Sequence, residues 1–132
     1  MAELSTYMED RIVNFMRNVA ITGQAAAYVA LFTGSASLVG LEAGTLTGEV
    51  SGGSYARQLA GLSASADGVS ANAADITFPT ATADWGIITY CALMDAVTAG
   101  NVLMYSALDA TKTIASGDTF KINATQLAVS VA

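Results

Sequence analysis

The sequence predicts a mainly β protein, an antiparallel β-sandwich of jelly-roll-like or immunoglobulin-like topology with one short N-terminal helix. Three observations lead to this fold class. Helical periodicity is confined to the first residues of the chain, and short stretches of β-forming residues separated by glycine-rich turns follow it. No helix-length pattern separates those stretches, which argues against a parallel sheet, because parallel strands need long crossover connections.

The N-terminal helix is expected over residues 5–20. A capping-box pattern, Thr6 followed by Glu9, places its start at Thr6 or Ser5. Its apolar residues recur at spacings of four, three and four, which puts them on one helix face: Met8, Ile12, Phe15 and Val19. This face either packs on the domain's own core or contacts a neighbouring subunit, and the pattern leaves both open.

The remainder, residues 27–132, is expected to form the sandwich. With 132 residues, the chain is expected to be a single domain. Strands 86–94 and 102–108 are predicted to form a hairpin around the turn Ala99-Gly100-Asn101. Segment 34–54 has six glycines and no aromatic residue, so we expect a flexible loop there. The other predicted strands lie at 28–33, 55–63, 76–78, 119–123 and 127–131.

Composition excludes several classes of function. Charged residues make up 12% of the chain, about half the usual ~25%. Five basic residues against eleven acidic ones give a net charge of −6, so nucleic-acid binding is not expected. The sequence has no histidine, which removes histidine-dependent catalytic triads and imidazole zinc sites. The single cysteine, Cys91, cannot form an intrachain disulfide.

No residue pattern indicates an enzyme, a cofactor or a metal site. The glycine-rich stretch 48–54 lacks the lysine of a phosphate-binding loop. Sugar stacking by strand aromatics is a minor alternative, since such residues more often belong to a core. Four aspartates are expected at turns or strand ends, where the side chain caps local backbone groups: Asp84, Asp95, Asp109 and Asp118.

Membrane insertion is not expected either. The longest uninterrupted apolar run is 25–32, far short of the roughly twenty residues that a spanning helix needs. The first residues are acidic where a secretory signal carries basic ones. We therefore expect a soluble protein without an export signal.

Several stretches of the chain resemble, in order, a family of small tailed-bacteriophage virion proteins. The most specific is Phe-Pro-Thr-Ala-Thr-Ala-Asp-Trp-Gly within 76–86, and the glycine-serine stretch 49–58 is weaker. The other matching stretches are 28–33, 100–105 and 112–120. Members of this family are often labelled tail fibre proteins, and similar small proteins act as cement or decoration proteins on phage capsids.

The resemblance implies a virion structural protein made in the host cytoplasm. The expected function is that of a capsid cement protein on the outer surface of the mature shell, where it staples adjacent major capsid protein subunits and stabilises the capsid. The alternative is a tail fibre or receptor-binding module of the tail. Interface area would supply the affinity for the shell. We expect a homotrimer at local threefold positions, with a dimer as the second possibility.

Segment 35–47 departs from the family pattern, because it is richer in Leu, Val and Gly than the polar loop expected there. It is either a hydrophobic turn tucked against the sandwich or an arm laid over a neighbour. Arg57 is the only basic residue between Arg17 and Lys112, and it pairs with a carboxylate inside the sandwich or bridges subunits. The expected subunit or capsid contacts are Met8, Ile12, Phe15, Leu38, Leu41, Tyr55, Arg57 and Trp85.

Overall fold

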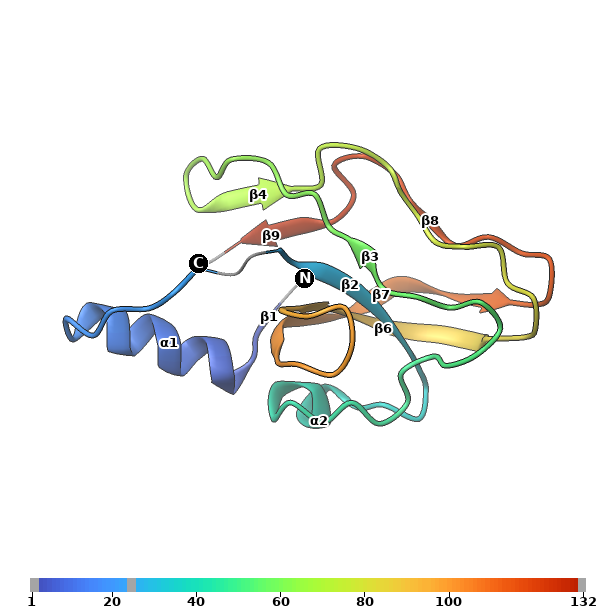
Figure 1. Cartoon of the computed structure of the whole chain (residues 1–132), viewed down its shortest axis with the longest axis horizontal. Helices are drawn as coiled ribbons and strands as arrows, with labels where there is room; N and C mark the ends of the chain where they lie inside the picture. The colour runs from blue at the N-terminus through green and yellow to red at the C-terminus, as the bar shows by residue number, and fades with distance from the viewer. Residues whose placement is uncertain (1–2, 24–25, 131–132) are drawn as a thin grey trace.

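A computed structural model describes residues 3–23 and 26–130. It confirms a mainly β, antiparallel, sandwich-like fold with a short N-terminal helix (Figure 1). One five-stranded sheet has the order β1-β7-β6-β2-β3, and two two-stranded ribbons pair β4 with β9 and β5 with β8. The strands are β1 (Glu3–Leu4), β2 (Tyr28–Thr33), β3 (Gln58–Leu59), β4 (Val69–Ala71), β5 (Ile76–Thr77), β6 (Gly86–Met94), β7 (Val102–Ile114), β8 (Lys121–Ile122) and β9 (Ala128–Ser130).

The centre of the sheet is the hairpin of β6 and β7, with β2 alongside. Leu93 faces Met104 across the hairpin, and Leu31 faces Cys91 across the β2–β6 pair. The connecting turn is held by Asp95, whose carboxylate accepts a hydrogen bond of 2.7 Å from the Asn101 backbone N–H. The hairpin and its turn at residues 99–101 are thus confirmed.

Both faces of this sheet are covered. On one face, Val29 and Leu31 join a core cluster with Phe78 and Phe120, which come from the segments around β5 and β8. On the other face, Ala30 and Phe32 pack with Leu41 from the helix α2 (Leu38–Glu42). The second layer therefore consists of two short ribbons and connecting loops rather than a second full sheet.

Segment 34–54 is more structured than the flexible loop expected from its composition. It contains α2, which begins at the N-cap Ser37, whose side chain accepts a hydrogen bond from the Gly40 N–H. Leu41 is fully buried, and Val50 lies in the core of the opposite face. Of the two interpretations of this segment, the structure shows the one in which it is tucked against its own sheet. Five residues are too few to show helical periodicity in the sequence. A helix this short is stabilised by tertiary packing rather than by its own propensity.

Several predicted boundaries were wrong for identifiable reasons. Helix α1 (Thr6–Met16) ends four residues before the expected end at residue 20, because Asn18 adopts a left-handed backbone with φ of 66°. Strand β7 continues to Ile114 although its second half is polar and exposed. Segment 55–63 contributes only β3, because Tyr55 and Arg57 turn their side chains to Glu49. Strands β1 and β4 were not anticipated, since each is very short.

Gly48 provides a test of the close packing within segment 34–54. Its φ is 87°, and a Cβ there would lie 2.6 Å from the Ala36 backbone nitrogen. Gly44 has a similar φ of 84° but open space around the same position. We expect Gly44→Ala to cost about 1–2 kcal/mol through backbone strain. Gly48→Ala should cost roughly 1–3 kcal/mol more, because overpacking adds to the strain. Urea unfolding of both variants measures the difference, and equal losses would contradict the close approach.

Candidate assembly interface

The root of the N-terminal helix is fixed to the central sheet by Ser5. Ser5 is fully buried, and its backbone N–H donates a 3.0 Å hydrogen bond to the Leu103 carbonyl. Its hydroxyl donates to the Val102 carbonyl and accepts from the Met8 N–H, which caps the helix. The start of the helix at Thr6, with Ser5 as the N-cap, agrees with the sequence prediction. The direction in which α1 leaves the sheet is therefore set by β7.

Beyond its first turn, α1 leaves the body of the molecule. It has no buried residue, and Figure 1 shows it projecting from one end of the protein. The chain then returns along it, where the Arg11 guanidinium donates to the Thr22 carbonyl. We call residues 6–23 the arm. Of the predicted contact residues, Met8 and Ile12 are partly buried, whereas Phe15 is 63% exposed.

The exposed apolar side chains of the arm extend beyond the residues that periodicity selected. Met16 is 72% exposed and Val13 50%, and Val19 and Ile21 are also exposed. Isolated exposed apolar residues are ordinary, but several on one projecting segment are typical of an interaction surface. Sequence reasoning missed Val13 and Met16 because they lie off the predicted face. The arm is the part of the molecule best suited to contact a neighbour.

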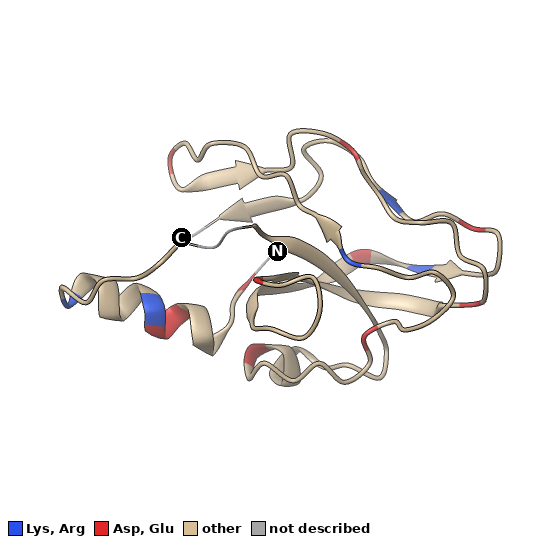
Figure 2. Ribbon diagram, viewed as in Figure 1, with Lys and Arg blue, Asp and Glu red and all other residues tan. Residues whose placement is uncertain are grey.

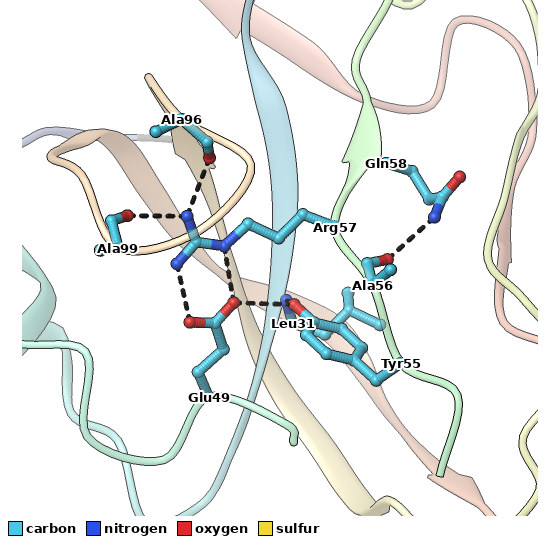
Figure 3. Close-up of polar contacts among 8 residues, drawn as sticks. All are labelled: Leu31, Glu49, Tyr55, Ala56, Arg57, Gln58, Ala96 and Ala99. Carbon is cyan, nitrogen blue, oxygen red and sulfur yellow. Dashed lines mark hydrogen bonds and ion pairs between the residues drawn. The ribbon is translucent and has the colours of Figure 1, made fainter. Parts of the chain in front are cut away.

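The predicted contacts Tyr55 and Arg57 belong to a polar cluster inside the protein (Figure 3). The Arg57 guanidinium makes a two-pronged ion pair with Glu49, with Nε–Oε1 at 2.7 Å and Nη2–Oε2 at 2.8 Å. Its Nη1 donates to the carbonyls of Ala96 and Ala99 in the β6–β7 turn. Arg57 is only 6% exposed, so its partner is a carboxylate of the same chain, and the intrachain alternative describes the structure.

Tyr55 completes this cluster by linking it to the sheet. Its hydroxyl donates to Glu49 Oε1 at 3.0 Å and accepts from the Leu31 N–H at 3.0 Å. Its ring packs edge-on against Trp85, with centroids 5.5 Å apart. Burial raises the pKa of the Tyr55 phenol, and the hydrogen bonds from Arg57 to Glu49 raise the pKa of the guanidinium. The cluster thus ties the Glu49 loop, the segment ahead of β3 and the β6–β7 turn to one another.

The other predicted contacts divide between core and surface. Leu38 is 43% exposed at the start of α2 and can meet a partner, as can the unpredicted Val39 at 78%. Leu41 and Trp85 are buried, and the Trp85 indole donates to the Gly53 carbonyl at 2.9 Å. The structure therefore gives Leu41, Arg57 and Trp85 roles within their own chain. A sequence cannot distinguish an apolar residue in an interface from one in a core, because charged residues are depleted in both environments.

The expected turn-capping role holds for three of the four aspartates. Asp84, Asp95 and Asp118 accept backbone hydrogen bonds at turns, for example from the Ser116 N–H to Asp84 at 2.9 Å. Asp109 was misplaced, because it lies exposed within the extended β7. One buried polar residue escaped the sequence analysis: Asn72, which is fully buried and accepts from the Leu127 N–H at 2.9 Å.

Cys91 is a buried free thiol whose pKa is raised to about 11 by burial. Among the residues that the structure describes, no three His, Cys, Asp or Glu side chains are grouped so that they could hold a metal ion. In the same residues, no helix has the length and apolar character needed to cross a membrane. Figure 2 shows charged residues scattered over the helices, loops and strands, with the Lys and Arg positions spread along the chain.

The Arg57 cluster leads to a prediction about stability. Arg57→Ala leaves the Glu49 carboxylate and two turn carbonyls without their partner, so we expect a loss of about 3 kcal/mol and a melting temperature lower by roughly 10 °C. Lys121→Ala is the matched control, because the Lys121–Asp75 pair is about half exposed and should change stability by less than ~1 kcal/mol. Calorimetry of both variants measures this. An unchanged melting temperature, with reduced assembly into virions, would instead indicate that Arg57 bridges subunits.

Tyr105 leads to a prediction about alkaline pH. Its hydroxyl donates to Glu3 at 3.0 Å, and burial followed by this hydrogen bond raises its pKa from 10.0 to about 12. The fold therefore favours the neutral phenol, so its stabilising contribution is complete below pH ~10 and is lost as the pH rises from 10 towards 12. Thermal melts between pH 8 and 12 should show this loss. Tyr105→Phe should reduce the slope, and an unchanged slope would contradict the assignment.

Comparison with known proteins agrees with a role in a phage particle. Residues 3–130 match the family model described as podophage GP4 fiber I protein gp80. No curated protein sequence matches the chain. The match spans the arm, the sheet and both ribbons. The chain therefore belongs to the podophage GP4 fiber I protein gp80 family and is a phage virion structural protein.

Proposed function

We propose that this chain is a structural subunit of a virion fibre and that it joins its neighbours through the arm, residues 6–23. The observation that carries the proposal is the group of uncovered apolar side chains on the arm, among them Phe15 and Met16 at 63% and 72% exposure. A helix this short gains most of its stability from packing an apolar face. Only the first turn of α1 packs against the core, through Tyr7 and Met8, and the described residues leave the apolar side chains further along it exposed. The family description, which names a fibre protein, supports the same role.

The exposure of the aromatic side chains favours a structural subunit of the fibre over a receptor-binding module. Recognition of sugars or proteins relies on exposed aromatic side chains. Here Trp85 and Tyr105 are 6% and 4% exposed, and Tyr55 has its hydroxyl engaged with Glu49. Phe15 is exposed, but it belongs to the arm. We also propose that the protein acts without catalysis or a bound cofactor, since the chain has no histidine and Cys91 is buried.

A capsid cement protein is the second candidate. The observation that favours it is the set of exposed apolar residues on the body, distributed over several elements, which would suit a broad contact with major capsid protein subunits. They are Val39, Leu59, Leu62, Val69, Ile87 and Val97. In this role a homotrimer, or else a dimer, would clamp adjacent shell subunits and stabilise the shell by binding the assembled state.

Copy number per virion separates the two candidates. Quantitative mass spectrometry of purified particles would measure this chain against the major capsid protein. We expect a small number of copies, together with antibody labelling at the fibres in electron micrographs. A copy number comparable to that of the capsid protein, with label over the shell, would overturn the fibre proposal in favour of the cement protein. Absence from purified virions would contradict both.

A further inference from the structure

A solvent-open cavity of about 280 Å³ lies between the β6–β7 hairpin and β9. We call it the edge groove, because it is bordered by the outer edge of β7. Strand β1 pairs with β7 only at Met104 and Tyr105, so the described part of the chain supplies no strand beyond that point. Two lining residues, Asp109 and Gln126, are exposed, which shows that the groove opens to solvent.

The groove is mainly apolar and large enough for side chains. An apolar cavity of about 150 Å³ can hold a benzene ring, so this one has room for a phenylalanine ring and part of a second side chain. No residue of the arm lines it. Its apolar lining comes from both layers of the fold: Cys91, Leu93, Met104, Leu108, Leu127 and Val129.

In the described part of the chain, the edge groove is thus open to solvent, and the apolar side chains on the outer part of the arm are exposed. Ser5 fixes the start of the arm to Val102 and Leu103, and helix α1 then projects from the body (Figure 1). Phe15 and Met16, in its last turn, are exposed. A second copy can offer its arm without changing the fold of either chain. Charge agrees with this pairing, because the exposed Arg17 follows Phe15 by two residues on the arm, while the exposed Asp109 lines the groove.

We propose that the arm of one copy docks in the edge groove of another, with Phe15 entering the cavity and Arg17 facing Asp109 at its opening. The inference rests on the proposed function, since it identifies the neighbour that the arm joins as a second copy of this chain. Arm and groove are different surfaces, so copies can join head-to-tail into a closed ring or an open chain, or two copies can exchange arms across a twofold axis. The ring and the open chain would give a fibre protein a repeating contact.

The first test is the mass of the purified full-length protein, measured by light scattering over a range of concentrations. We expect an oligomer that Phe15→Asp weakens roughly tenfold or more, because a buried aromatic side chain is replaced by a charge. Leu108→Trp places a larger side chain in the groove, so it should weaken the same oligomer by blocking the surface that receives the arm. Val97→Asp is the matched control, as it places the same charge at an exposed apolar residue in the β6–β7 turn. Circular dichroism and melting temperature confirm that each variant is folded.

The second test identifies which surfaces meet. Phe15→Cys and Leu108→Cys are combined with the buried Cys91 left unchanged, each single variant serving as the control for links to Cys91, and disulfide formation under mild oxidation is followed by mass and peptide mapping. Docking predicts a 15–108 link between chains only when both cysteines are present, because a disulfide requires Cα atoms within about 7 Å. A link from Phe15→Cys alone would show arm-to-arm pairing, and a 15–108 link within one chain would show that the arm folds into its own groove. Either result overturns the proposal.

A monomer at all concentrations, or an oligomer that Phe15→Asp leaves unchanged, would also overturn the proposed docking of the arm in the edge groove. These outcomes are separate from the virion measurement. A chain located in fibres but monomeric in solution and unlinked by the cysteine pair loses only the arm-to-groove contact. A chain that forms the linked oligomer but occurs at capsid copy number loses only the fibre assignment.

Discussion

The sheet of β2, β6 and β7 is apolar on both faces, and the rest of the chain is arranged around the need to cover it. The four consecutive residues 29–32 in β2 are all fully buried, so side chains that point to opposite faces are equally removed from water. An antiparallel sheet often leaves one face in solvent. Here α2 covers one face and the two ribbons cover the other. Short elements and loops, rather than a second full sheet, therefore enclose the core.

The covering segments are held by buried polar side chains as much as by regular structure. The Arg57 guanidinium binds Glu49 and the carbonyls of the β6–β7 turn, and Asn72 binds the chain ahead of β9. Each is buried and hydrogen-bonded to several groups, so removing a partner would leave a desolvated polar group. Such contacts fix a single arrangement of loops that have little local preference of their own. They also explain how a glycine-rich sequence with few charges yields a defined structure.

The arm is the element that this requirement does not account for. Only its first turn packs against the core, through Tyr7 and Met8, and the apolar residues of its helix increase in exposure away from the Ser5 anchor, from the partly buried Met8 to the exposed Met16. A segment that contributes little to the stability of its own subunit can be committed to a neighbour at little cost to folding. The chain belongs to a phage fibre protein family, which agrees with our proposal that this segment joins neighbouring subunits.

The central strands, the hairpin turn and the start of the helix follow from local sequence. Strands β2 and β6 match their predicted bounds, because strand formation there depends on consecutive β-forming residues and on the turn residues between them. Long-range packing instead places Leu41 and Trp85 in the core, leaves Phe15 exposed and pairs Arg57 with Glu49. Arg57 also binds Ala96, 39 positions along the chain. Local periodicity shows which face of an element is apolar, whereas what covers that face depends on contacts between segments that no local pattern relates.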